Sequence, residues 1–108
     1  DEMNLIRCGV MDIAYSVHGV PIRLTEERWQ HIIERHFDLF NYKEDILEVI
    51  EEPEYIYRAR RGAFIATRSY GRRGFLRVYY KEQKNDGFII TARFADTLPK
   101  EVRIWPFH

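Results

Sequence analysis

Cysteine is scarce in this sequence: Cys8 is the only one among 108 residues, so an internal disulfide is excluded. This usage is typical of a reducing compartment, and we expect a cytoplasmic location. Long apolar runs are also missing, because no stretch approaches the roughly 18 consecutive apolar residues of a membrane span. The first residues, Asp1 to Asn4, are acidic and polar, unlike a signal peptide. We therefore expect no membrane association.

Several catalytic templates are absent as well. No glycine-rich phosphate loop precedes a helical segment, and neither Ser16 nor Ser69 has a triad context. His31 and His36 are five residues apart, which does not match the i, i+4 spacing of a helical metal-binding pair. No other group of His, Cys or carboxylate residues has ligand spacing, so we expect neither a metal nor another cofactor.

What the sequence does contain is enough apolar material for one folded domain. Apolar residues make up 45% of the chain and aromatic residues 15%, which supports a core without a metal or disulfide. There is no internal repeat and no low-complexity tract. We expect a single domain spanning residues 1–108, and the sequence specifies no oligomeric state.

The net charge of the chain is zero, but its acidic and basic residues are segregated along the sequence. The chain has 17 basic and 17 acidic residues, yet residues 24–54 hold ten acids and three bases. Residues 55–81 hold eight bases and no acid, and seven of these bases are Arg, which suits bidentate phosphate contacts. This segregation favours a basic surface that binds nucleic acid. The alternative is that these arginines pair with the acidic segment. The predicted RNA-binding residues are Arg58, Arg60, Arg68, Arg72, Arg73, Arg77, Tyr79 and Lys81.

Two helices are predicted in the N-terminal half of the chain. Thr25 is expected to cap the first, whose apolar stripe recurs at helical spacing from Trp29 to Phe40. Asn41 to Glu44 has the form of a capping box, so a second helix is expected from there to Pro53.

Strand patterns dominate the second half. Alternating or apolar runs predict strands over 55–60, 63–70, 75–82, 88–94 and 102–105. Asn85-Asp86-Gly87 is a tight-turn signal. A weaker extended region precedes the helices, with a strand over 10–17 and an extended lead-in over 21–24. We therefore predict an α+β fold in which the two helices pack on an antiparallel β-meander of four to five strands.

The first predicted helix carries a cluster of chemistry-bearing residues. His31 and Arg35 are four residues apart and share a side away from the apolar stripe, whereas His36 falls within the stripe. Histidine can act as a general base or acid near neutral pH. The alternatives are that His31 and Arg35 form a solvated surface and that His36 is structural.

The strands carry a second set. Alternation puts Arg77, Tyr79 and Lys81 on one face of their strand. Thr91 and Arg93 likewise share a face. If that face lies toward the helices they meet His36, and if it lies toward solvent they belong to an open basic surface. Imidazole, hydroxyl and guanidinium groups together suit metal-independent RNA cleavage, because they can move protons and stabilise charge on a phosphate. Strand tyrosines could stack unpaired bases, although core packing is the alternative for them.

Three stretches resemble the small phage- and plasmid-borne nuclease domains of the barnase–EndoU–colicin–RelE group. They are Trp29 to His36, Ile46 to Pro53 and Asp86 to Phe94, and the resemblance covers about residues 20–100. It implies helices followed by a four-stranded antiparallel sheet, and metal-independent cleavage of tRNA or mRNA. The catalytic residues that it implies are His31, Arg35, His36, Thr91 and Arg93.

We therefore predict a small, toxin-like endoribonuclease that cleaves tRNA or mRNA through attack of a 2′-hydroxyl on the adjacent phosphate, with a cognate antitoxin as a possible protein partner. Two alternatives stay open. One is a non-catalytic nucleic-acid-binding module that uses the same basic strands. The other is a domain whose basic strands dock an acidic protein such as an antitoxin.

Overall fold

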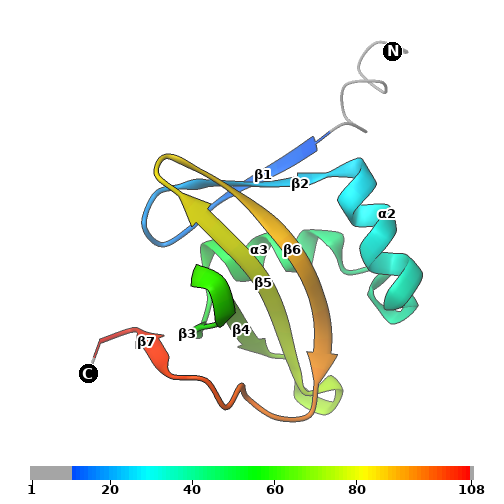
Figure 1. The fold of residues 1–108 in the computed structure, drawn as a ribbon. Helices are drawn as coiled ribbons and strands as arrows, with labels where there is room; N and C mark the ends of the chain where they lie inside the picture. Colours follow the sequence, from blue (N-terminus) through cyan, green and yellow to red (C-terminus); the bar gives the residue numbers. More distant parts are fainter. Residues whose placement is uncertain (1–10, 108) are drawn as a thin grey trace.

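Seven strands and two α-helices form within residues 11–107, the part of the chain that this computed structural model describes (Figure 1). Short 3₁₀ turns lie at Phe37–Leu39, Arg60–Gly62 and Gly71–Arg73. The main elements are β1 (Met11–Tyr15), β2 (Pro21–Thr25), α2 (Glu26–Arg35), α3 (Lys43–Glu51), β3 (Tyr55–Arg58), β4 (Phe64–Ser69), β5 (Phe75–Gln83), β6 (Asp86–Ala95) and β7 (Arg103–Trp105).

All seven strands join one mixed sheet, in the order β1-β2-β6-β5-β4-β3-β7. The α+β fold is confirmed, and β3 to β6 form an antiparallel meander as predicted. The strand predicted over 102–105 forms as β7 and pairs with β3 at one edge. The predicted sheet is nevertheless too small, because the β1–β2 hairpin extends the other edge. A purely antiparallel sheet was also wrong, since β2 pairs with β6 in parallel.

The parallel pairing depends on one glycine. Ile22 of β2 lies opposite Gly87 of β6. A Cβ atom at Gly87 would clash with the Lys81 carbonyl oxygen and with the Ile22 side chain, so glycine permits the close approach of β2. The turn itself is formed by residues 84–85, with Lys84 at a φ of 55°, and not by the predicted Asn85–Gly87. This pairing joins segments distant in sequence, which local patterns cannot specify.

Helix α2 begins as predicted and ends earlier. The Thr25 hydroxyl accepts a hydrogen bond from the Arg28 amide at 3.1 Å and caps the helix. At His36 the backbone leaves helical geometry, with φ −135° and ψ 71°. The predicted stripe through Phe40 was therefore wrong: Phe37 and Phe40 are 72% and 55% exposed, because the 3₁₀ turn redirects the chain.

Helix α3 presents Ile46, Val49 and Ile50 to the core, and Glu44, Glu48 and Glu51 to solvent. The capping box predicted at Asn41 is not formed. Tyr42 occupies the N-cap position and makes no side-chain capping bond. Burial of three aliphatic side chains therefore holds this helix in place, since α-helices of this length gain most of their stability from packing.

The main hydrophobic core lies on one face of the sheet, so the two faces differ. Leu76, Val78 and Tyr80 of β5 are fully buried and belong to the same apolar cluster as the buried residues of α2 and α3. In Figure 1, α3 lies behind β5 and β6, and α2 lies beside β6. We call the side of the sheet facing α3 the helix-covered face and the opposite side the helix-free face. Residues that alternate with the core residues point to the helix-free face.

The hydroxyl of Tyr80 is a weak point of the core. It is buried and has no hydrogen-bond partner within residues 11–107, and burial raises the pKa of this phenol. Because an unsatisfied buried donor costs free energy, Tyr80→Phe is expected to raise the free energy of unfolding by about 1 kcal/mol. Urea denaturation of the two proteins tests this, and a less stable variant would contradict it.

Stability should also depend on alkaline pH through Tyr70. Its hydroxyl donates to the Asp45 carboxylate at 3.0 Å. Burial, with this hydrogen bond, raises the Tyr70 pKa from 10.0 to about 12. The folded state therefore keeps a proton that the unfolded state loses, so the free energy of unfolding should fall as pH rises through this interval. In denaturation curves measured between about pH 9 and 12, Tyr70→Phe should make this fall in the free energy of unfolding shallower. An equally steep fall in the variant would show that Tyr70 is not its cause.

Candidate nucleic-acid interface

Four of the predicted site residues lie together on the helix-free face. Leu76, Val78 and Ala92 point into the core, so the residues between and beside them point away from the helices. The strand register pairs Arg77 with Arg93 and Tyr79 with Thr91. The side chains of directly opposed residues begin about 4.5–5.5 Å apart. Thr91 and Arg93 therefore face away from the helices. Of the two placements considered for them, this is the one that puts them on an open basic surface.

The opposed arginines Arg77 and Arg93 are unusual, because like charges in this position repel. Arg93 is exposed, and no acidic side chain in residues 11–107 forms an ion pair with either guanidinium. Arg77 is only 8% exposed, and within the same residues its Nε has no hydrogen-bond partner. A bound anion would relieve both the repulsion and the uncompensated buried charge.

Arg77 is held in place by neutral groups. One of its terminal nitrogens donates to the Thr97 carbonyl oxygen at 2.7 Å, and the other lies 3.4 Å from the Tyr79 hydroxyl. Thr97 belongs to the segment that leads from β6 to β7, so this segment passes close to the helix-free face. Arg77 therefore acts as a fixed charge beneath the surface, whereas Arg93 is free to reach a ligand.

Helix α2 has two different flanks. Gln30 donates to Glu26 at 2.8 Å, and Lys43 of α3 lies 4.0 Å from Glu26. This flank therefore faces α3. At about 100° per residue, the opposite flank carries the basic residues, which lie away from α3. These basic residues, called here the α2 basic flank, are Arg28, His31 and Arg35.

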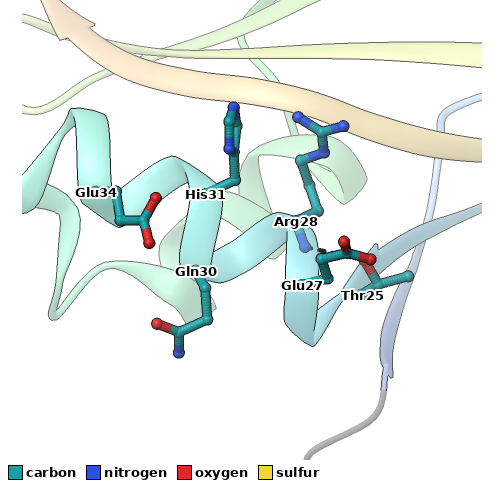
Figure 2. Close-up of a pocket in the computed structure, with 6 residues that line it drawn as sticks. All are labelled: Thr25, Glu27, Arg28, Gln30, His31 and Glu34. Carbon is teal, nitrogen blue, oxygen red and sulfur yellow. Dashed lines mark hydrogen bonds between the residues drawn. The ribbon is translucent and has the colours of Figure 1, made fainter.

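A shallow hollow of about 500 Å³ lies along the outer side of α2. It is lined by residues of α2 and its N-cap alone. Figure 2 shows that His31 and Arg28 extend toward the side on which β6 runs, while Gln30 extends the other way. Helix α2 contacts β6, the strand that carries Thr91 and Arg93, so Arg28 and His31 extend toward the side of the helix on which that strand lies (Figure 2).

The structure does not bring the predicted catalytic residues into direct contact. His31 and Arg35 are exposed on α2, and His36 is half-buried where the helix ends. Within residues 11–107 no hydrogen bond joins either histidine to Thr91 or Arg93. His36 is bound through its backbone amide, which donates to the Ile32 carbonyl at 2.8 Å. A substrate phosphate would have to bridge the helix and the strand.

The other predicted RNA-binding cations divide into two groups. Arg68 donates to the Glu52 carbonyl and lies 3.7 Å from Glu48, so it pairs with the acidic segment. Arg73 stacks on Tyr42 and Phe94, and lies 3.8 Å from Asp38. Arg68 and Arg73 therefore pair with acidic residues, which was the alternative to RNA binding, because both lie at the helix-covered side. No ion pair within residues 11–107 engages the others, Arg58, Arg60, Arg72 and Lys81.

Two residues of this surface were missed from the sequence. Arg28 lies three residues before His31 and seven before Arg35, a helical spacing that could have identified it. Thr97 carried no such signal, because it acts through its backbone carbonyl.

The chain matched no protein-family model, no curated protein and no solved structure when compared with them. No helix in the described range 11–107 is long and apolar enough to cross a membrane. In the same range, no group of three His, Cys, Asp or Glu side chains is placed to hold a metal ion.

Proposed function

We propose that this protein is a small metal-independent endoribonuclease whose scissile phosphate binds at Arg93, between Thr91 and the α2 basic flank. The observation that carries the proposal is the opposed pair Arg77 and Arg93, which lacks an acidic partner within residues 11–107 and lies beside a strand hydroxyl. Such a pair favours a phosphate, and the histidines of α2 supply the groups for proton transfer.

The chemistry assigns a separate task to each group. One histidine, His31 or His36, takes the proton of the RNA 2′-hydroxyl, whose oxygen then attacks the adjacent phosphorus. The bond from phosphorus to the 5′ oxygen breaks, and a proton donor protonates that leaving oxygen. Arg93 and Arg35 stabilise the charge that grows on the phosphate, and Thr91 orients it. The products are a 2′,3′-cyclic phosphate and a free 5′-hydroxyl.

The substrate class is tRNA or mRNA, and the cations without acidic partners bind other phosphates of the same RNA. Tyr79 is half-buried on the same face and can contact a base or sugar there. The proposal includes a cytoplasmic location and a toxin-like role, with a cognate antitoxin that covers the basic surface through acidic groups.

An RNA-cleavage assay in EDTA tests the proposal. Wild-type protein is incubated with total tRNA and with mRNA, alongside folded His31→Ala, His36→Ala and Thr91→Ala variants. We expect cleavage that survives chelation, yields 2′,3′-cyclic ends, and is lost in one histidine variant. A strand carrying a single 2′-deoxy substitution at the cleavage position should stay intact. Cleavage that requires a divalent cation would reject the proposal, and so would the absence of cleavage by folded wild-type protein.

One alternative is favoured by the lack of any hydrogen bond, within residues 11–107, between the helix histidines and Thr91 or Arg93. It is a non-catalytic RNA-binding module on the same surface. It predicts binding that weakens steeply with salt, because each neutralised phosphate releases counterions. Arg93→Ala would then lower affinity, while His31→Ala would act like wild type. A chain that neither cleaves nor binds RNA would instead favour the third candidate, a domain for an acidic protein partner.

A further inference from the structure

A second cavity, of about 390 Å³, lies at the opposite end of the sheet from the α2 basic flank. His18 from the β1–β2 turn, Arg58 from β3 and Phe64 from β4 line it, together with Arg103 to Phe107. In Figure 1 the β1–β2 turn and β7 both lie on the left side. The volume falls within the roughly 300–1,000 Å³ of small-molecule sites.

Aromatic rings provide the apolar part of this cavity. Phe64 packs on the buried Tyr80 ring, with centroids 5.5 Å apart, so its position is fixed by the core. Trp105 is half-buried on β7, and Phe107 is 79% exposed. The exposed Phe107 side chain, beside the Phe64 and Trp105 rings, is suited to contacting a flat ligand.

Polar groups of two kinds flank the rings. Arg58 is exposed and forms no ion pair within residues 11–107, so it can bind an anion. His18 Nδ1 lies 3.1 Å from both carboxylate oxygens of Glu82. Because a carboxylate can only accept here, Nδ1 carries the proton and Nε2 is left to contact a ligand. Glu82 thus orients the imidazole at the cavity wall.

We propose that this cavity binds a nucleotide, with the base against Phe64 and Trp105 and the phosphate on Arg58. Aromatic rings beside a guanidinium match a flat base joined to an anion, and the oriented imidazole offers a hydrogen bond to the base edge or the sugar. The nucleotide is either free or part of an RNA strand. The site does not depend on catalysis at Thr91, because Phe64 and Tyr80 lie on the helix-covered side of the sheet.

Tryptophan fluorescence provides a direct test. Trp105 lines the cavity, whereas Trp29 is 7% exposed in the core and serves as a constant background. UMP, AMP, ribose 5-phosphate, inorganic phosphate and a short single-stranded RNA are titrated separately. We expect saturable quenching by UMP or AMP, and at least tenfold weaker binding of the two probes that lack a base. A tenfold or greater gain with the RNA would identify a strand as the occupant; no gain would identify a free nucleotide.

Matched variants complete the test. Arg58→Ala and Phe107→Ala should each weaken UMP binding about tenfold. Their controls are Lys100→Ala and Phe37→Ala, which remove an exposed cation and an exposed ring outside the cavity. Trp105 lines this cavity and not the surface around Thr91, so failure of the nuclease proposal would not affect this result. The inference would be overturned by unsaturable quenching, by phosphate binding as tightly as UMP, or by wild-type affinity in both cavity variants.

Discussion

Replacing Arg93 with alanine is expected to lower the rate of RNA cleavage about 100-fold, the typical loss when one preorganised donor to a developing negative charge is removed. Arg93 is exposed and lies directly opposite the buried Arg77. The same substitution should leave the fold intact and raise the free energy of unfolding by about 0.5 kcal/mol, because it removes a cross-strand repulsion. Loss of activity with a gain in stability would distinguish a functional role from a structural one.

Kinetics on a defined RNA and urea denaturation measure the two effects separately. Lys100→Ala is the matched control, since Lys100 is an exposed cation that forms no ion pair within residues 11–107. Arg93→Lys keeps the charge but loses the bidentate geometry, so it should recover only part of the rate. Cleavage by Arg93→Ala at the rate of the control would remove Arg93 from the mechanism.

Gly74→Ala is expected to destabilise the protein by about 3 to 4 kcal/mol, the largest stability effect of a single change proposed for this chain. Gly74 has a φ of 89°, which an L-residue rarely adopts. A Cβ atom there would also clash with the backbone carbonyl oxygen of Ala95. Since Gly74 ends the turn between β4 and β5, relief of the clash must move one of two interior strands.

Gly71→Ala provides the control within the same turn. Gly71 has a φ of 60°, but a Cβ there would meet nothing within 4 Å. It therefore shows the conformational cost alone, about 1 to 2 kcal/mol. The difference between the two variants in urea denaturation measures the clash with Ala95 together with the extra backbone strain at Gly74, whose ψ is −134°. Equal losses for both would show that the strand end moves freely and that the clash carries no energy.

Local patterns were sufficient for much of the fold. The Thr25 cap, the two helices and the strands of the meander all depend on side chains close in sequence, whose spacing reports burial on one side. The same patterns failed beyond His36, where Phe37 and Phe40 continue the helical spacing while the backbone does not. A single non-helical residue redirects the chain there, and apolar spacing carries no information about it.

Three features could be read from residue patterns alone: the α+β class, the acidic segment 24–54 followed by the basic segment 55–81, and the alternation that groups Thr91 with Arg93. The face of the sheet that those two residues occupy depends on packing against the helices, because alternation fixes relative and not absolute orientation. Long-range packing also paired β2 with the strand segment at Gly87 and assembled His18, Phe64 and Trp105 around one cavity. These arrangements depend on the close packing of distant segments, whose partners are chosen by shape and burial across the whole core.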